Sequence, residues 1–235
     1  CSVLIELRNP ASGPHVGPLS VFDRSLADRV LVRSHATAQH VPPTTKEALM
    51  TTALLVIDVQ QSFMHRPFWR ADDVPDFIAR LQQLIDRCAA RDIPVVQVFH
   101  EQEKEGPNGP FSRYSGLVKT LQELRIDPVA VFHKSVHSAM FARAADGQTL
   151  EQWLRARGID HVIVTGIRTE QCCETTARHA SDLGFKVTYV PDATLTFPMV
   201  AESGRTYSPA ELKERTELVL TGRFADVVLA EAVNI

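Results

Sequence analysis

The chain lacks several features that would assign a protein of 235 residues to a particular class. Its cysteines form neither a CxxC pair nor the spacing of a disulfide framework or a zinc knuckle. No run approaches the roughly 18 apolar residues that a membrane span needs, and the first residues lack the charged segment and apolar core of a secretion signal. Reduced thiols without a targeting signal predict a cytoplasmic protein, and the four cysteines are Cys1, Cys88, Cys172 and Cys173.

The chain also has no large excess of charge of one sign. The formal net charge is -3, and the chain contains no cluster of Lys and Arg of the kind that binds phosphates or anionic lipids. We therefore expect neither nucleic acid nor a membrane as a partner. The first predicted strand is followed by DVQQSF and not by a GxGxxG loop, which argues against a nucleotide-binding oxidoreductase, and we expect no cofactor.

The composition changes near Met50. Residues 1–49 contain no Met and carry scattered Pro, His and Ser with weak periodicity. Met50 directly precedes TTALLVID, an apolar segment typical of a first strand. We therefore predict an N-terminal extension over residues 1–49 and one functional domain over residues 50–235.

Within this domain, short apolar runs alternate with segments of helical periodicity. The order strand, helix, strand, helix predicts an α/β fold, with a mainly parallel six-stranded sheet between two layers of helices in a Rossmann-like, three-layer α/β/α arrangement. The expected strands occupy residues 53–58, 94–100, 129–134, 161–166, 186–193 and 225–230, and the expected helices residues 74–92, 150–159 and 169–185.

Three chemically active side chains lie where predicted strands end. Asp58 ends the first strand, Lys134 ends the third, and Cys172 follows the fourth. Because the carboxyl ends of parallel strands gather at one edge of a sheet, we expect the acid, amine and thiol to converge. Each residue alone is more often structural, but the set has the parts of an amide-cleaving site. A helix N-terminus beside a Lys also predicts a lowered pKa for the Cys172 thiol.

Helix geometry separates the two adjacent cysteines. Cys173 has the i, i+4, i+7 spacing with Ala177 and Ala180 that favours packing on the sheet. Cys172 falls at the third position of a helix capped by Thr169, where free backbone N–H groups favour a thiolate. Cys172 is therefore the better candidate nucleophile, and Cys173 is expected in the core.

Three motifs in order carry a resemblance to a known family. The segments LLVIDVQQSF, VFHKSVHSAMF and TGIRTEQCCETTARHASDLGFKVTYVPDA resemble the isochorismatase-like cysteine hydrolases, in their amidohydrolase branch, from about Thr51 to the C-terminus. The family pattern of Gly, two variable residues, Thr, two variable residues and Cys runs here from Gly166 through Thr169 to Cys172. The resemblance implies the isochorismatase-like hydrolase fold.

The resemblance also implies roles for individual residues. Asp58 corresponds to the general acid/base, Lys134 to the third catalytic member and Cys172 to the nucleophile. It further implies a cis peptide bond between Ile167 and Arg168 and an oxyanion hole formed by the backbone N–H groups of Arg168 and Cys172. The expected activity is cleavage of a C–N bond in a small amide or a carbamoyl or ureido compound through a thioester. Members of the family are often dimers or larger assemblies, so a homo-oligomer, a dimer or a tetramer, is expected.

Metal binding is not expected from this sequence. Nicotinamidases of this family resemble one another in an Asp-x-His segment with a further His that binds a metal, whereas His100 stands here without that pairing. His133 and His137 have i, i+4 spacing, but they flank Lys134 in a strand-to-loop segment and lack a third ligand.

The substrate pocket is less well defined by the sequence. Gln60, Phe63, Trp69 and Phe197 are candidates for its wall, although they could equally belong to the core. Arg113 and Arg205, in two loops that follow strands, are candidates to bind a substrate carboxylate, against the alternative of solvated surface. The alternative to an enzyme is a non-catalytic isochorismatase-like module that binds a small molecule or a protein, but all three catalytic positions are filled.

Overall fold

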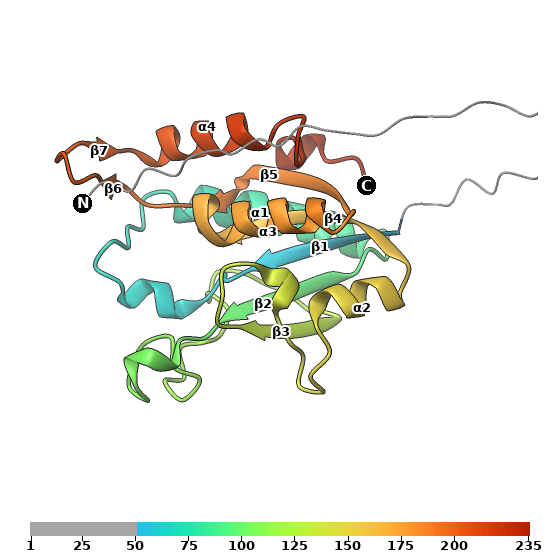
Figure 1. Ribbon diagram of the computed structural model, residues 1–235, viewed down its shortest axis with the longest axis horizontal. Helices are drawn as coiled ribbons and strands as arrows, with labels where there is room; N and C mark the ends of the chain where they lie inside the picture. The colour runs from blue at the N-terminus through green and yellow to red at the C-terminus, as the bar shows by residue number, and fades with distance from the viewer. Residues whose placement is uncertain (1–50) are drawn as a thin grey trace, which may run out of the picture. The chain divides into compact units, whose positions relative to one another are not determined.

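The structure, a computed structural model, describes residues 51–235, and the predicted extension at residues 1–49 lies outside the described part (Figure 1). Six strands form one sheet in the order β3-β2-β1-β4-β5-β8, and each neighbouring pair is parallel. The predicted α/β fold with a six-stranded, mainly parallel sheet is confirmed. The strands are β1 (Thr51–Ile57), β2 (Val95–His100), β3 (Ala130–Lys134), β4 (Ile159–Ile167), β5 (Lys186–Leu195) and β8 (Asp226–Val227).

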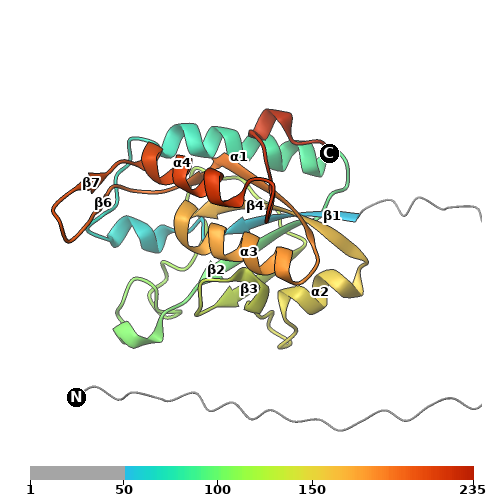
Figure 2. The same ribbon diagram turned by 45° about the horizontal axis from the view of Figure 1, so that its top comes forward.

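Helices cover both faces of this sheet (Figure 2). Leu54 and Val56 of β1 join the apolar cluster that contains α1, while Leu55 and Ile57 join the cluster that contains α2 and α3. Burial on both faces explains why β1 is a continuous apolar run and not an alternating one. Each such side chain contributes roughly 1.5–3 kcal/mol when it is fully buried. The helices are α1 (Val74–Ala89), α2 (Leu150–Ala156), α3 (Glu174–Asp182) and α4 (Pro209–Leu220).

The C-terminal region differs from the sequence prediction. The last strand was expected over residues 225–230 but comprises only Asp226–Val227. The backbone of Ala230 forms its hydrogen bonds with side chains and not with the neighbouring strand. Asp192 Oδ1 accepts a hydrogen bond from the Ala230 N–H at 2.8 Å, and Arg87 of α1 donates to the Ala230 carbonyl at 2.6 Å. The short helix η5 (Ala230–Ala232) therefore replaces the strand.

The segment after β5 also contains structure that the sequence analysis treated as loop. A two-stranded antiparallel hairpin, β6 (Met199–Val200) and β7 (Thr206–Tyr207), precedes α4. Ser208 and Glu211 form a capping box, with Pro209 at the first helical position. These signals are local, so α4 could have been predicted from the sequence. Among the described residues, no helix combines the length and the apolar character needed to cross a bilayer.

Gly166 allows β1 and β4 to approach each other at the edge that carries the site. Its φ is 122°, and a Cβ atom there would lie 1.9 Å from the Ile57 carbonyl oxygen. We expect Gly166→Ala to lower the free energy of unfolding by more than about 3 kcal/mol, because backbone atoms cannot move aside as a flexible side chain can. Denaturant unfolding measures this loss.

Gly184→Ala provides the matched control. Gly184 also has a positive φ, of 86°, but nothing lies within 4 Å of its added Cβ. Only the conformational cost of roughly 1 kcal/mol is expected there. Equal losses in the two variants would show that the contact with Ile57 does not determine the requirement for glycine.

Candidate active site

Asp58, Lys134 and Cys172 meet at the carboxyl edge of the sheet. Asp58 follows β1 in a left-handed conformation with φ 55°, which Asp tolerates better than most residues. Lys134 Nζ lies 2.7 Å from Asp58 Oδ2 and 3.3 Å from Cys172 Sγ. The side chains of Lys134 and Asp58 are fully buried, and Cys172 is 6% exposed. The structure thus brings together the three side chains that the strand ends predicted.

The turn that carries Cys172 differs from the predicted helix start. Thr169–Cys173 forms a π-helical turn, and α3 begins only at Glu174. The Thr169 hydroxyl contacts Thr194 Oγ1 at 2.8 Å and does not cap a helix. The prediction of Cys172 at the third position of a capped helix is therefore wrong.

The backbone of Arg168 connects β4 to the turn that carries Cys172. The peptide bond between Ile167 and Arg168 is cis. The Arg168 carbonyl accepts hydrogen bonds from the N–H groups of Gln171 and Cys173, each at 3.2 Å. Cys173 is fully buried in the core cluster of α3, as predicted.

The pKa of the Cys172 thiol is raised, which corrects the expectation of a lowered value. Burial has the largest effect, the Asp58 carboxylate raises the pKa further, and the Lys134 ammonium lowers it by less. Burial alone would lower the pKa of Lys134, but Asp58 and Cys172 oppose it and the net pKa is raised. The resting site is therefore a neutral thiol beside a Lys–Asp ion pair.

Two histidines that the sequence analysis did not assign to the site complete this cluster. His100 Nδ1 lies 3.2 Å from Lys134 Nζ, and His137 Nδ1 lies 3.7 Å from Cys172 Sγ. Their rings stack at a centroid distance of 6.5 Å. Burial, together with the Lys134 charge, lowers the pKa of His100 to about 4, so its ring is neutral near pH 7. The position of His100 at the end of β2 was the signal in the sequence.

The cluster is poorly suited to a metal ion. Ligand atoms of Asp58, His100 and Cys172 lie within 4.8 Å of one another. Lys134 Nζ, however, contacts all three residues at 2.7–3.3 Å. A buried ammonium group among the ligands repels a divalent cation. His133 is engaged elsewhere, with Nδ1 at 2.7 Å from Glu101 Oε1.

A cavity of about 640 Å³ opens in front of Cys172. A volume of this size suits a small molecule. Its lining combines aromatic side chains with polar and charged groups. Phe63 and Phe111, which both line it, pack edge to face at 5.0 Å. The other lining residues include Phe68, Arg66, Gln171, Arg168 and His137.

Of the four residues predicted for the pocket wall, Phe63 lines this cavity. Gln60 lies behind it, where Oε1 accepts from the His100 N–H at 2.8 Å and Nε2 donates to the His100 carbonyl at 3.0 Å. Trp69 and Phe197 pack on each other at 5.1 Å and belong to the apolar core behind the wall. Gln60 thus holds the backbone of His100, and does not line the cavity.

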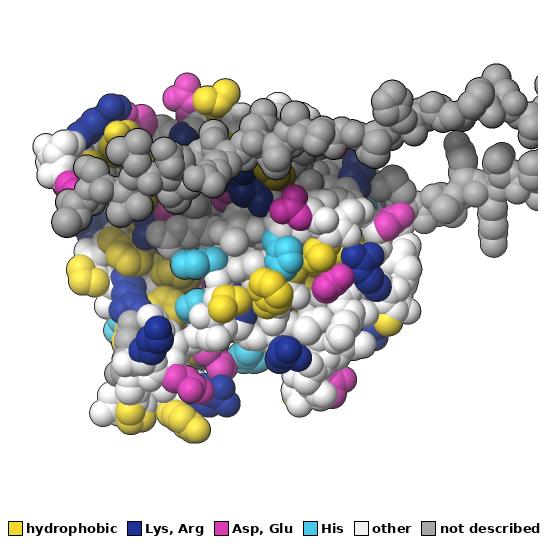
Figure 3. Space-filling view, in the orientation of Figure 1, with side chains coloured by type: hydrophobic (Ala, Val, Ile, Leu, Met, Phe, Trp, Pro, Cys, Tyr) yellow, Lys and Arg dark blue, Asp and Glu magenta, His cyan; other side chains and the backbone are white. Residues whose placement is uncertain are grey.

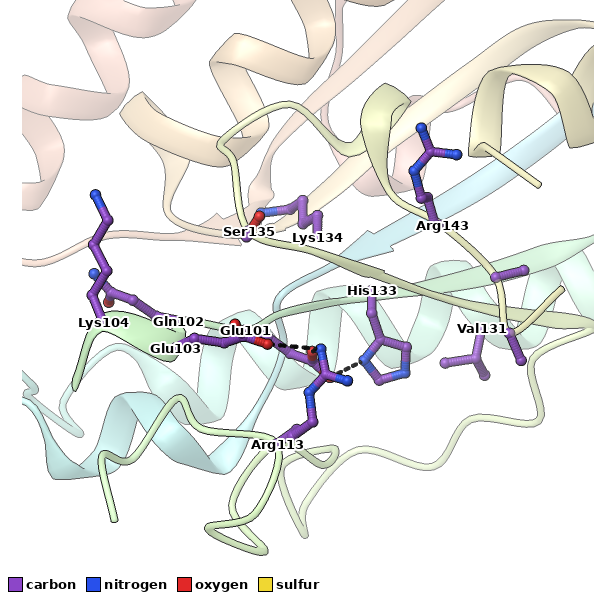
Figure 4. A pocket seen from close by; sticks show the side chains of 12 residues that line it. Glu101, Gln102, Glu103, Lys104, Arg113, Val131, His133, Lys134, Ser135 and Arg143 are labelled. Atoms are coloured by element: carbon purple, nitrogen blue, oxygen red, sulfur yellow. Dashed lines mark hydrogen bonds and ion pairs between the residues drawn. The ribbon is translucent and has the colours of Figure 1, made fainter. Parts of the chain in front are cut away.

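A neighbouring cavity of about 900 Å³ lies beside β3 (Figure 4). Arg113 is there and not in the cavity of Cys172, with its guanidinium 3.1 Å from both Glu101 and Glu103. Glu101 also contacts His133. Arg205 pairs with Glu211 at 3.0 Å in a third region. Neither arginine that the sequence suggested faces Cys172.

Two apolar side chains between β3 and α2 are exposed. Val136, which lines the cavity of Cys172, is 47% exposed, and Phe141 is 59% exposed with its ring 4.5 Å from that of His179. On the face of the molecule shown in Figure 3, hydrophobic and histidine side chains lie next to one another. The predicted homo-oligomer stays a prediction.

Comparison with known proteins places the chain in a family. The sequence profile described as Isochorismatase domain matches residues 52–223, so the chain belongs to the isochorismatase family, as the motifs predicted. Nicotinamidase 3 of Arabidopsis thaliana is 30% identical over 159 residues, covering 62% of this chain and 73% of that protein. Ureidoacrylate amidohydrolase RutB of Variovorax paradoxus is 27% identical over 198 residues, covering 68% and 76%.

A solved structure of an isochorismatase-family protein from Chromobacterium violaceum has the same fold. The TM-score is 0.66 at 27% sequence identity, and the match covers 77% of this chain and 90% of that chain. The family and the fold are thus established by the sequence profile and by the structural match.

Proposed function

We propose that the protein is a cysteine hydrolase that cleaves the C–N bond of a small amide or a carbamoyl or ureido compound. The observation that carries this proposal is the contact of Lys134 Nζ with both Asp58 and Cys172, two residues that line a cavity. A thiol, a carboxylate and an ammonium group in contact can supply a nucleophile, a proton acceptor and charge stabilisation. The names of the nicotinamidase and ureidoacrylate amidohydrolase relatives support amide hydrolysis.

Proton transfer accompanies attack in this mechanism. Because the pKa of Cys172 is raised, the thiol keeps its proton until substrate enters. Among the described residues, Asp58 Oδ1 is buried without a hydrogen-bond partner, so it can accept that proton. The sulfur then adds to the carbonyl carbon, while Lys134 balances the charge that develops on the carboxylate and the sulfur.

The second half of the reaction releases both products. The tetrahedral intermediate carries an oxyanion, which the backbone N–H groups of Arg168 and Cys172 stabilise in this proposal. Asp58 gives its proton to the leaving nitrogen, and ammonia or an amine departs as the thioester forms. Asp58 then removes a proton from a water molecule, which hydrolyses the thioester to a carboxylate and restores the thiol.

Ammonia release from a panel of primary amides, carbamoyl amino acids and ureido acids tests the proposal. We expect at least one compound to be hydrolysed, and acid quenching during turnover should trap an acyl group on the peptide that contains Cys172, as detected by mass spectrometry. Compounds that bind and raise the thermal midpoint without being cleaved or forming an adduct would instead favour the non-catalytic binding module.

A further inference from the structure

The imidazole of His137 contacts the sulfur of Cys172, and the proposed chemistry gives it no role. Its Nδ1 lies 3.7 Å from Cys172 Sγ, at hydrogen-bonding distance for a sulfur atom. His137 lines the cavity of Cys172 and is exposed to solvent, whereas the side chains of Lys134 and Asp58 are fully buried. The sulfur is therefore in contact with a buried ion pair and also with a histidine that water can reach.

Contacts with α3 fix the loop that carries His137. The N–H of Ala139, two residues further on, donates to Thr176 Oγ1 at 2.9 Å. The Thr176 hydroxyl in turn donates to the Cys172 carbonyl at 2.6 Å. The His137 ring also lies against that of His100, with 6.5 Å between the centroids and 21° between the planes. One threonine thus ties the loop to the nucleophile turn, so His137 keeps its place beside the sulfur although it is exposed.

Lys134 occupies some of the hydrogen-bond acceptors around the sulfur and leaves others. Its Nζ lies 2.7 Å from Asp58 Oδ2 and 3.2 Å from His100 Nδ1. Among the described residues, Asp58 Oδ1 is buried without a partner. His137 Nδ1 contacts the sulfur, but a sulfur that carries an acyl group has no proton to share. In the thioester state, Asp58 Oδ1 and His137 Nδ1 are therefore two acceptors that Lys134 leaves open beside the acyl group.

A water molecule that attacks the thioester has two hydrogens, and Asp58 removes one of them in the proposed function. We propose that His137 Nδ1 accepts a hydrogen bond from the other hydrogen and so holds the water against the acyl group on Cys172. This inference rests on the proposed function, because it concerns hydrolysis of the same thioester. The water oxygen bonds to the acyl carbon, the C–S bond breaks, and Asp58 returns its proton to the sulfur. The second hydrogen leaves with the acid, which ionises in solvent.

Turnover of p-nitrophenyl acetate tests this role with a defined probe. p-Nitrophenolate is released when the acetyl group moves to Cys172, and mass spectrometry after acid quenching gives the fraction of Cys172 that is acetylated. Turnover divided by that fraction is the rate constant of thioester hydrolysis, and turnover divided by the remaining fraction is the rate constant of acetylation. In His137→Phe, which keeps a ring beside His100, we expect hydrolysis to slow about tenfold and acetylation to stay within about threefold.

His133→Phe is the matched control. His133 is the other histidine that flanks Lys134, but its Nδ1 lies 2.7 Å from Glu101 Oε1 in the neighbouring cavity (Figure 4). Both rate constants should be unchanged in this variant. His137→Asn should keep part of the hydrolysis rate, because an amide oxygen can take the place of Nδ1 as acceptor. His137→Leu provides a second form without an acceptor if His137→Phe does not fold.

The same data separate this inference from the proposed function. If wild type carries no acetyl group on Cys172, the assignment of the nucleophile fails, and the water site fails with it because no thioester exists. If Cys172 is acetylated and the rate constant of hydrolysis does not depend on His137, the inference is overturned while the nucleophile stands. An equal fall of both rate constants in His137→Phe would also overturn it, because a residue that only supports the structure would slow both steps.

Discussion

Replacement of Cys172 by alanine is expected to lower kcat for amide hydrolysis by about ten-thousandfold or more, because no thioester can form without the sulfur. The effect should fall on kcat and not on the stability of the fold, since Cys172 is 6% exposed and borders a cavity. Turnover is measured by ammonia release with a compound identified in the substrate panel, and folding by the thermal midpoint.

Cys173→Ala is the matched control for this experiment. Cys173 is the chain neighbour of Cys172 but is fully buried in the core, where its thiol acts as a small apolar group. We expect kcat to stay within about threefold of wild type, with a modest loss of stability from the removed volume. Loss of turnover in Cys173→Ala with turnover retained in Cys172→Ala would reverse the assignment of the nucleophile.

The second large effect is expected from the buried pair of Asp58 and Lys134. Their side chains are fully buried and joined at 2.7 Å. Asp58→Asn leaves the Lys134 ammonium buried without its counter-charge, which should lower the free energy of unfolding by about 3–5 kcal/mol. The proposed proton acceptor is also lost, so turnover should fall to the level of Cys172→Ala. Denaturant unfolding and ammonia release measure the two effects.

The double variant Asp58→Asn/Lys134→Met separates the two roles of the pair. It removes both charges, so its stability should exceed that of Asp58→Asn although its turnover remains lost. If the two charges are not coupled, the losses in free energy of unfolding from Asp58→Asn and Lys134→Met will add in the double variant. Such additivity would contradict the prediction.

The pH dependence of stability gives a further readout of the same pair. In wild type the pKa of Lys134 is raised, so its contribution is complete below the unfolded value of about 10.4 and is lost only as the pH rises through the higher folded value. In Asp58→Asn, burial acts without the Asp58 charge, which opposes it most strongly, and should lower the pKa of Lys134. The unfolded state then binds more protons, so the stability of this variant should increase as the pH rises toward 10.

The sequence by itself determined the family, the parallel α/β fold and the three residues proposed as catalytic. These inferences depend on local patterns: continuous apolar strands, helical periodicity, and Asp58, Lys134 and Cys172 next to strand ends. Because parallel strands place their carboxyl ends at one edge, position along the chain was enough to predict that these side chains meet. The buried position of Cys173 followed from helical spacing in the same way.

Only the tertiary structure determined the pKa of Cys172 and the contacts between residues that are distant along the chain. Burial and the neighbouring Asp58 reverse the expected shift of the Cys172 pKa, and no helix pattern records that contact. The ring of His137, the packing of Trp69 behind the cavity, and the unpaired Nε of Arg168 likewise depend on which loops come together. A sequence specifies the residues that can do chemistry, but their protonation and ligands depend on neighbours that are distant along the chain.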